Sequence, residues 1–393
     1  MMRYLIDRGI DAHLYLFKDE LDHFLPENDT WSISIYSTRI HNLECGFPFK
    51  DLFSFRYNEF KQFVNFDIVI GCGLSPFYFA MNRLKLDFFI PYGSDLYEIP
   101  FRTFSLRSPK HILAEILNSL FLKRQQKNGI KNARINVVLD FAKSYTAALN
   151  KLGVKSVKLH IPMVFREQDE FEVLPQVILD RLTSLKDNFV IIQHSRQYWY
   201  ASLDGANVED MKYNNLLIRA IKILVEDGHH NVRCIFLEYG PDINRSKALI
   251  EELNLNNYFI WLPKMPRKFL MKIISDYAQL GVDQFGGGYF GGTGYEVLAC
   301  GKPLMNAISI SPDKYKEITG IDFPPIINVS TVEEIAAAIS YYLATPDKLA
   351  ILAQKSKNWF DENCGTGLID TYIKMFKEIK AEKVKELGAQ ATT

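Results

Sequence analysis

A glycine-rich loop followed by a short helix is the segment of this sequence most suited to chemistry. Residues 288–303 read GYFGGTGYEVLACGKP. Such a loop lets the phosphates of a ligand approach bare backbone amides at a helix N-terminus, where the helix dipole also favours negative charge. Gly301 suits the left-handed position after the last helical turn, and Pro303 cannot continue the helix. The segment predicts a site for a nucleoside diphosphate that carries a further group, with Glu296 on the inward face of the helix.

Two cations follow an earlier apolar strand. Arg196 comes soon after the predicted strand 189–193, and Lys212 lies at the start of the next helix. Arginine is a planar fork and lysine a point charge, so together they can clamp a diphosphate at the mouth of a parallel strand. An isolated arginine and lysine of this kind are more often solvated charges on the surface. The strand edge that the pair shares with the glycine-rich loop favours the functional interpretation.

Other nucleotide-binding and catalytic motifs are weak or absent in the sequence. Gly286, Gly288 and Gly291 satisfy GxGxxG after a strand, but they lie deep in the second half and not in its first βα turn. They are therefore weak evidence for NAD. Gly301 and Lys302 end a helix and lack the serine or threonine that follows in a P-loop. The sequence contains neither GxSxG nor a kinase motif set.

Composition argues against several classes of protein. Lys+Arg equals Asp+Glu, 46 each, whereas a dedicated nucleic-acid binder carries a basic excess. Five scattered cysteines without a CxxC pair fit the reduced thiols of a cytoplasmic protein better than a disulfide frame or a zinc site. The histidines show no ligand spacing, so we predict no metal and no cofactor. Residues 1–11 lack a signal-peptide core, and no apolar run reaches the ~20 residues that span a bilayer.

The elements that must position these residues alternate between strands and helices. This alternation predicts two Rossmann-like, doubly wound α/β domains that face a cleft, and ligands bind beyond the carboxyl ends of such strands. The predicted strands are 12–17, 67–70, 88–90, 136–139 and 158–161 in the first half, and 189–193, 232–237, 258–261 and 280–283 in the second. The predicted helices are 109–127, 214–226, 245–253, 267–276 and 332–344, the last opened by a capping box at Thr331 and Glu334.

We expect three parts in the chain. Residues 1–165 form an N-terminal acceptor domain, and residues 166–360 form a C-terminal donor domain. Residues 361–393 form a C-terminal helix that crosses back to the first domain, and a tail. The acidic, polar segment 167–172 is the predicted interdomain linker.

The beginning of the chain departs from the usual α/β order. Such a domain usually opens with a strand and a glycine-rich turn before its first helix. Here residues 1–7 are predicted as a helix closed by Gly9, and residues 12–17 as the first strand. The first strand of the N-terminal domain is therefore missing from its expected place. Either the chain is truncated or that strand lies elsewhere.

A basic segment bears on the acceptor. Residues 102–134 hold eight Lys and Arg against one acid, Glu115, and an apolar stripe at helical spacing. One interpretation, the commoner for such a helix, is core packing with a solvated basic face. The other is contact with an anionic membrane. The stripe consists of Ile112, Leu113, Ile116, Leu117, Leu120 and Phe121.

On these residues the chain resembles retaining glycosyltransferases of the GT-B fold, family 4 in particular. The family pattern is E-G-F-G-x-x-x-x-E-A-M-A-x-G-x-P. Phe290 and Gly291 fall on its Phe-Gly, and Glu296 falls on its second glutamate; Ala299, Gly301 and Pro303 fall on the closing residues. Arg196 and Lys212 resemble the family's phosphate-binding pair. The segment 91–95 resembles the Gly-Ser-Asp loop of capsule- and lipopolysaccharide-type members, with Gly93 and Ser94 on the acceptor side.

The resemblance implies roles for these residues. Glu296 would accept hydrogen bonds from the ribose hydroxyls of the donor, while Arg196 and Lys212 would stabilise the departing diphosphate without a metal. Asp95 would orient acceptor or sugar hydroxyls, and an Asx turn is the equally open alternative. The donor site would also include Gly240 of the strand–Gly element, Leu262 of the base-reading turn, and Gly288, Phe290, Gly291, Gly292 and Thr293 of the loop.

One departure from the family pattern matters for the sugar. The family's first glutamate is Gly288 in this chain. Its contact with a sugar hydroxyl must come from Asp283, from Gln284 or from backbone amides.

The resulting hypothesis is a hexosyltransferase of surface polysaccharide biosynthesis. It would move a sugar from a nucleoside-diphosphate-sugar to a glycan or lipid-linked acceptor, in the cytoplasm or at the inner face of the membrane. Two alternatives stay open. Gly288 and the missing strand would also suit a non-catalytic sugar-nucleotide-binding or scaffold protein. A nucleotide-sugar epimerase on the same fold would need an acid/base set for which the sequence gives no convincing candidates.

Overall fold

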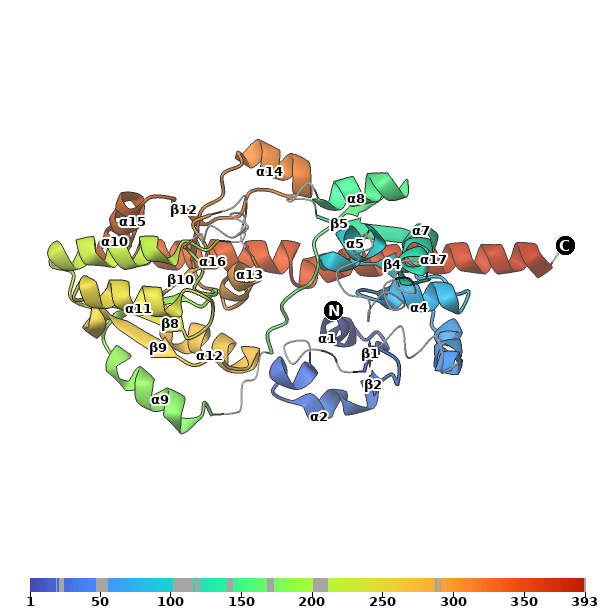
Figure 1. Cartoon of the computed structure of the whole chain (residues 1–393), viewed down its shortest axis with the longest axis horizontal. Coiled ribbons are helices and arrows are strands. Elements are labelled where there is room, and N and C mark those ends of the chain that lie inside the picture. Colours follow the sequence, from blue (N-terminus) through green and yellow to red (C-terminus); the bar gives the residue numbers. More distant parts are fainter. Residues whose placement is uncertain are drawn as a thin grey trace.

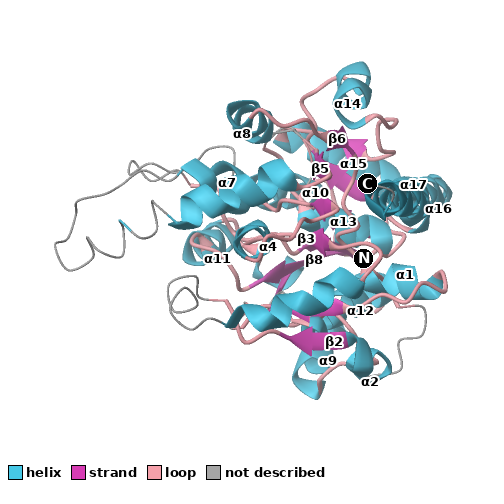
Figure 2. Cartoon of the chain, turned by 90° about the vertical axis from the view of Figure 1, so that its right-hand side faces the viewer, coloured by secondary structure: helices cyan, strands magenta, loops and turns pink. Residues whose placement is uncertain are grey.

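The computed structural model describes most of the chain. The described residues are 1–18, 20, 25–46, 56–101, 116, 121–139, 144–167, 173–200, 211–286, 289 and 291–391. Within them all strand pairs are parallel: six strands form a sheet in the second half, four form a sheet in the first half, and two form a separate sheet near the N-terminus. The strands lie in the middle of the molecule with helices on both sides (Figure 2). This is the doubly wound α/β architecture that the sequence predicts.

The second half is built around the six-stranded sheet, in the order β12-β11-β10-β7-β8-β9 (Figure 1). In β7, Val190 and Ile192 join one apolar cluster and Ile191 joins another. Burial on both faces explains why this strand is a continuous apolar run. The strands are β7 Phe189–Gln193, β8 Val232–Leu237, β9 Phe259–Leu262, β10 Leu280–Val282, β11 Leu304–Asn306 and β12 Ile327–Asn328.

Helices cover both faces of this sheet. One apolar cluster receives side chains from α9, α12, α13 and α14, and the other from α10, α11 and α15. In α10, Leu217, Ala220, Ile221 and Leu224 are all buried, as their helical spacing predicts. The helices are α9 Gln176–Leu182, α10 Asn214–Glu226, α11 Ile243–Glu252, α12 Arg267–Tyr277, α13 Gly292–Ala299, α14 Pro312–Thr319 and α15 Val332–Ala344.

Two helix ends in this half follow their sequence signals. The capping box is present: the Thr331 hydroxyl accepts from the Glu334 amide, and the Glu334 carboxylate accepts from the Thr331 amide. Gly301 follows α13 with a φ of +67°, in the left-handed region. The C-terminal end of the helix before Pro303 is therefore where the sequence predicts it.

The first half contains the smaller sheets. β3-β4-β5-β6 form one sheet, and β1-β2 form another that is not hydrogen-bonded to it. The strands are β1 Leu14–Leu16, β2 Ile40–Asn42, β3 Ile70–Gly71, β4 Phe88–Phe89, β5 Ile135–Val138 and β6 Val157–Lys158. The helices are α1 Met2–Asp7, α2 Ile33–Tyr36, α4 Ser75–Met81, α5 Ser94–Tyr97, α7 Lys123–Asn132 and α8 Ser144–Leu152, and a 3-10 segment spans Arg56–Asn65.

The predicted helix 109–127 lies only partly in the described residues. α7 continues to Asn132, beyond the predicted end. Gly129 lies inside this helix because α4 packs closely against it: a Cβ on Gly129 would lie 1.9 Å from the Pro76 carbonyl oxygen. The glycine is therefore needed for helix contact and does not end the helix.

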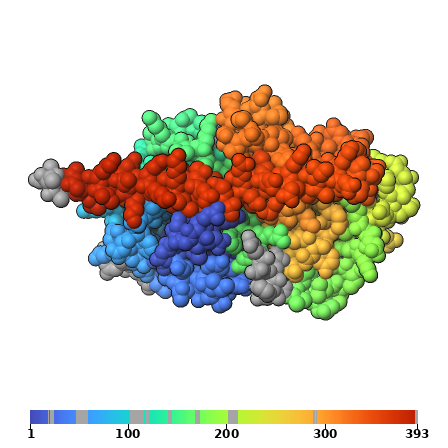
Figure 3. All heavy atoms as spheres, turned by 180° about the vertical axis from the view of Figure 1, so that it is seen from behind, coloured from blue at the N-terminus to red at the C-terminus, as the bar shows by residue number. Residues whose placement is uncertain are grey.

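Two long helices close the chain. α16 (Pro346–Asn363) and α17 (Thr366–Ala391) run along one side of both halves (Figure 3). In α17, Ile369, Tyr372 and Phe376 pack in one cluster with Phe88 of β4 and Val137 of β5. The last helix therefore covers the sheet of the first half. No helix within the described residues has the length and apolar character needed to cross a membrane.

Candidate functional site

The candidate site lies where the strands of the six-stranded sheet end. The carboxyl ends of neighbouring parallel strands meet at one edge of a sheet. β7 and β10 are neighbours in this sheet, so the segments after Gln193 and after Val282 lie side by side. The first segment contains His194, and the second contains Asp283, which precedes the start of α13.

Asp283 holds the beginning of α13. Its carboxylate accepts hydrogen bonds from the Gly291 amide and the Thr293 hydroxyl. Its own carbonyl accepts from the Ser195 hydroxyl at 2.7 Å and from Gln193 Nε2 at 3.2 Å. Asp283 thus joins the loop after β10 to the loop after β7. The Gly291 amide, which the sequence predicts as a phosphate donor, is engaged by Asp283.

Among the described residues, the first backbone amides of this helix without a hydrogen-bond partner lie one residue further on. Gly292 and Thr293 are its first residues, and the amides of a first helical turn have no intrahelical partner. They point out of the N-terminus, where the helix dipole favours an anion. Gly288 and Phe290 lie outside the described residues.

Glu296 is a buried carboxylate that contacts a histidine and an arginine. Its Oε2 lies 2.8 Å from His194 Nε2, and its Oε1 lies 2.7 Å from Arg267 Nε. Burial alone raises the pKa of a carboxyl group, but the hydrogen bond from His194 and the charge of Arg267 hold the pKa of Glu296 below its ordinary value. Glu296 is therefore ionised at neutral pH.

Arg267 connects the site with the first half of the chain. Its Nη1 lies 3.4 Å from Asp29 Oδ1 and donates to the Met163 carbonyl at 3.3 Å. Arg3 forms an ion pair with the same Asp29. Although burial lowers it, the charges of Glu296 and Asp29 keep the pKa of Arg267 above its ordinary value. A row of alternating charges thus runs from Glu296 in α13 to Arg3 in α1.

Lys212 and Gln284 are brought together, as the sequence predicts for two residues of one site. Lys212 Nζ contacts Gln284 Oε1. Gln284 Nε2 donates to the Tyr289 carbonyl at 2.6 Å, and Asn306 Oδ1 accepts from the Gln284 amide at 3.1 Å. The lysine charge is therefore held at the loop that follows β10.

Arg196 lies in the same loop as His194. Its guanidinium carbon is 5.0 Å from the centroid of the Tyr198 ring, a cation–π arrangement. The structure therefore places Arg196 beside the residues that hold α13. A direct role of Arg196 at the donor phosphates stays a prediction.

Gly240 packs against the loop after β7. Its φ is +117°, and a Cβ added there would lie 2.4 Å from the Gln197 carbonyl oxygen. The Gln197 amide donates to the Tyr239 carbonyl at 2.7 Å. Leu262 is fully buried at the end of β9, and its carbonyl accepts from the Glu238 amide at 2.8 Å. Both residues thus lie where β8 and β9 end. These strands are on one side of β7 in the sheet, and β10, which leads to α13, is on the other.

We expect Gly240→Ala to lower the free energy of unfolding by about 1–3 kcal/mol, because the new methyl group meets backbone as well as an unfavourable φ. Gly228→Ala is the matched control, since Gly228 has a φ of +88° and nothing within 4 Å of an added Cβ. Denaturant unfolding of both variants measures the difference. An equal loss in the two variants would mean that the close approach at Gln197 has no energetic effect.

Asp95 lies in the first half and turns its carboxylate toward its own loop. The carboxylate accepts from the amides of Gly73 and Gly93, each at 2.9 Å, and from Tyr92 at 3.2 Å. Gln126 Nε2 donates to the Asp95 carbonyl at 3.0 Å. An Asx turn would bond to the amide two residues further on, whereas these partners all precede Asp95 in the chain, so the carboxylate is held by backbone amides in a different arrangement. Gly93 and the adjoining Ser94 are thereby fixed at the start of α5, and their place on the acceptor side stays a prediction.

Asp95 gives a pH-dependent prediction. Burial raises the pKa of Asp95 to about 6, against the opposing effect of the backbone amides, whereas an unfolded aspartate titrates at ~3.9. Between about pH 4 and 6 the folded chain binds more protons at this site than the unfolded chain, so Asp95 lowers stability as the pH rises. Two pKa units correspond to about 3 kcal/mol.

The test compares wild type with Asp95→Asn by denaturant unfolding at pH 4.5 and pH 7. We expect the stability of the wild type to fall relative to that of the variant as the pH rises between these values. Asp313→Asn, at an exposed position of α14, is the control. If the stability of the wild type and of Asp95→Asn changed equally between the two pH values, the proposed protonation of Asp95 would be wrong.

The basic segment 102–134 is described only at residue 116 and from residue 121. In that part, Gln126, Gly129 and Ile130 are buried on one side of α7. Arg134 forms an ion pair with Glu386 of α17 at 2.6 Å. This end of the segment packs in the core, while the prediction of membrane contact for residues 102–134 also rests on residues outside the described part of the chain.

Sequence reasoning missed two residues of the site, and only one of them gave a signal. His194 follows a buried strand at its carboxyl end, which is where ligand-binding residues gather in such sheets. The sequence alone does not show that it contacts Glu296. Arg267 follows Pro266 at the start of a helix, and nothing in its spacing marks it as the partner of Glu296.

Comparison with known proteins identifies the domain that carries the site. Residues 205–359 match the family of glycosyl transferases group 1. The match covers less than half of the chain and includes Lys212, Asp283, Gln284 and Glu296. The match supports glycosyl transfer as the chemistry of these residues. A search of curated proteins found no match to the chain.

Solved structures share the fold over nearly the whole chain. A glycosyltransferase from Rickettsia africae superposes with a TM-score of 0.53 at 15% identity, over 96% of this chain and 92% of that chain. A sucrose-phosphate synthase from Thermosynechococcus elongatus gives a TM-score of 0.52 at 12% identity, over 97% and 92%. At these identities the likeness concerns the fold. The predicted fold, with two Rossmann-like units in a GT-B-like arrangement, is confirmed.

Proposed function

We propose that this protein is a retaining, metal-independent glycosyltransferase of family 4 type. It transfers a sugar from a nucleoside-diphosphate-sugar to a glycan or lipid-linked acceptor in surface polysaccharide biosynthesis. The observation that carries the proposal is the convergence of Lys212, an ionised Glu296 and the first amides of α13 at one edge of the second sheet. The group 1 match over the same residues supports it.

The donor is held by complementary charges in this proposal. The Gly292 and Thr293 amides and Lys212 bind the diphosphate, with Arg196 as a second cation. Glu296 has two oxygens with about four lone-pair positions, of which His194 and Arg267 occupy two. The remaining positions accept hydrogen bonds from the ribose hydroxyls. A carboxylate that is already ionised and fixed suits this task, because it needs no reorganisation when the donor binds.

The reaction breaks the bond between the anomeric carbon and the diphosphate oxygen. Negative charge then grows on the leaving diphosphate, where Lys212, Arg196 and the helix dipole stabilise it. The acceptor hydroxyl attacks the same face that the leaving group vacates, and its proton passes to a phosphate oxygen. This order of steps retains the anomeric configuration. It uses only groups that belong to the donor or to the second half of the chain.

The acceptor side is the first half. In the proposal, the Gly93–Asp95 loop borders the acceptor, and the basic segment 102–134 brings the protein to an anionic membrane at the inner face. Co-sedimentation with vesicles of phosphatidylglycerol, compared with vesicles of phosphatidylcholine alone, tests the membrane contact. Equal binding to both kinds of vesicle, or to neither, would argue against it.

A donor screen tests the proposed function itself. Thermal unfolding is measured with UDP-, GDP-, TDP- and ADP-sugars, because a ligand that binds only the folded state raises its stability. We expect one nucleotide to raise the unfolding temperature, and the matching donor to be hydrolysed slowly in the absence of acceptor. Binding without any hydrolysis or transfer would favour a sugar-nucleotide-binding protein. No stabilisation by any of the four would contradict the donor site.

A further inference from the structure

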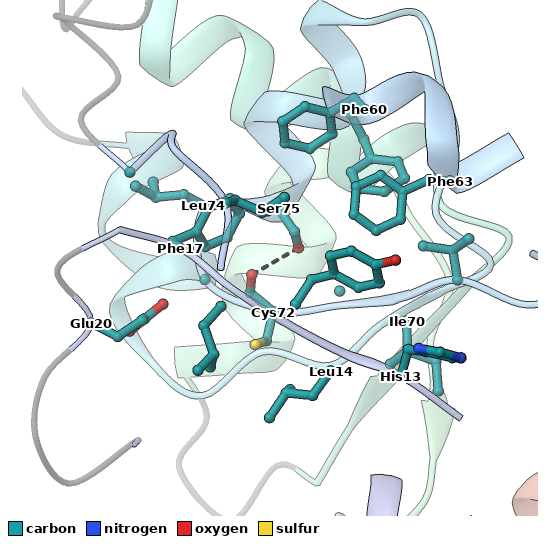
Figure 4. Close-up of a pocket in the computed structure, with 18 of the residues that line it drawn as sticks. His13, Leu14, Phe17, Glu20, Phe60, Phe63, Ile70, Cys72, Leu74 and Ser75 are labelled. Carbon is teal, nitrogen blue, oxygen red and sulfur yellow. Dashed lines mark hydrogen bonds between the residues drawn. The ribbon is translucent and has the colours of Figure 1, made fainter. Parts of the chain in front are cut away.

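A pocket of about 560 Å³ lies between the two sheets of the first half (Figure 4). Two uninterrupted runs of chain line it: residues 13–18, which include β1, and residues 68–75, which include β3. Phe60, Phe63 and Phe79 cover it from one side. The group 1 domain contributes no residue to this lining, so the pocket is separate from the site described above.

The lining shows that strand edges face the pocket. Successive side chains of a strand point to opposite faces, so a pocket that touches every residue of a run must lie beside its backbone edge. Within the described residues, β1 pairs only with β2, and β3 pairs only with β4. The other edge of each strand therefore borders the pocket.

Backbone hydrogen bonds identify the groups that face it. On the β2 side, the Leu16 carbonyl accepts from Leu43 and the Lys18 amide donates to Cys45. Alternate residues direct their backbone groups to opposite edges, so those of Tyr15 and Phe17 face the pocket.

The same argument applies to β3. The Val69 carbonyl accepts from Phe88 and the Gly71 carbonyl accepts from Ile90 on the β4 side. The backbone groups of Ile68 and Ile70 therefore face the pocket from its other side.

The two strands belong to one layer and run in the same direction. Tyr15, Phe17 and Val69 lie in one apolar cluster, and Ile68 and Ile70 lie in a second cluster on the opposite face. The odd-numbered residues of both strands thus share a face. In β1, the backbone groups of these odd-numbered residues point into the pocket. In β3, the backbone groups of the odd-numbered residues point away from the pocket, toward β4. For L-residues this combination holds only when the two strands are parallel.

The strand order shows what is missing from this layer. With one strand placed in the pocket, the sheet reads β2-β1-new-β3-β4-β5-β6. In a doubly wound fold of order 3-2-1-4-5-6, the new strand has the position of strand 1. Strand 1 is followed by a helix that leads to strand 2. In this chain α1 precedes β1, which holds the position of strand 2.

We propose that the pocket is the seat of one further parallel β-strand, which pairs with both β1 and β3 and leads directly into the N-terminal end of α1. The bordering runs correspond to a strand of about five or six residues, ~17–20 Å long. Apolar clusters cover both faces of the layer, so the strand is a continuous apolar run without polar alternation. It joins the two sheets of the first half into one.

The test extends the full chain before Met1. The added segment is an apolar strand of sequence Val-Leu-Ile-Val-Ile-Val followed by a loop of three glycine and serine residues. The control carries proline at the second and fourth strand positions, because proline cannot donate to a ladder. Amide hydrogen exchange is measured by mass spectrometry in the chain with no extension, the strand variant and the proline variant.

We expect exchange in the segments around Tyr15 and around Ile70 to slow at least tenfold in the strand variant alone. β9 is an edge strand of the other sheet and serves as the internal reference, where exchange stays unchanged. Equal exchange in the strand and proline variants would overturn the proposal. So would protection that arises in the unextended chain on dimerisation, detected by sedimentation, since the occupant would then be a second copy. Neither measurement depends on donor binding or turnover.

Discussion

Replacing Glu296 by glutamine is expected to lower kcat/KM for the nucleotide-sugar by about 100-fold or more, in the range found when a preorganised catalytic hydrogen-bonding group is lost. The amide has no negative charge to balance Arg267, and it offers the ribose hydroxyls a weaker acceptor. Steady-state kinetics with the donor identified by the thermal screen measure the effect. Glu333→Gln, at an exposed glutamate of α15, is the control and should keep full turnover.

The effect of Glu296→Gln on stability must be separated from its effect on turnover. Removing one partner of a fully buried ion pair costs about 3–5 kcal/mol. We expect a smaller loss here, because the Arg267 side chain is 34% exposed and keeps Asp29 as a partner. The double variant Glu296→Gln with Arg267→Gln removes both charges, so we expect it to regain stability while its turnover stays low. If turnover returned together with stability, Glu296 would be a structural residue and its proposed contact with the donor would be wrong.

Lys212→Gln is expected to have the second largest effect, a loss of about 100-fold that falls mainly on kcat. The charge on the diphosphate grows as the bond to the sugar breaks, so a cation at this position stabilises the transition state more than the bound donor. Lys212→Arg keeps the positive charge and should recover part of the loss. Lys222→Gln, on the helix α10 that follows Lys212 and in an ion pair with Glu226, is the control.

Two outcomes would contradict this role for Lys212. An increase in KM at unchanged kcat would mean that the lysine contributes only to ground-state binding. Unaltered kinetics in both Lys212→Gln and Arg196→Ala would remove the cationic clamp from the mechanism altogether. In that case the amides at the start of α13 would be the remaining groups that stabilise the leaving group.

Local signals in the sequence predicted the second half well. The strand Phe189–Gln193 was predicted with its observed bounds, because a short apolar run before a polar loop is typical of a buried parallel strand. The capping box at Thr331 and the glycine after α13 depend on contacts within a few residues. Such short-range chemistry can be recognised without the fold.

The partners of the site residues could not be predicted in the same way. Glu296 meets His194 across 102 positions in the sequence. Arg267 belongs to a different βα unit, and its contact with Glu296 depends on how α12 packs beside α13. Asp95 shows a second reason why a site residue could not be predicted from the sequence. Its Gly-Ser-Asp context suits both a catalytic carboxylate and a turn, and only its bonds to three amides show that the loop occupies it.

The way α17 lies across the molecule has a consequence for dissection of the chain. This helix follows the second half in sequence, yet Ile369, Tyr372 and Phe376 pack on Phe88 and Val137 of the first half. A fragment that stops near residue 165 would leave that apolar surface bare to water and prone to self-association. An isolated N-terminal lobe is therefore best prepared by co-expression with residues 366–391 as a separate peptide, which would act as its complementing piece.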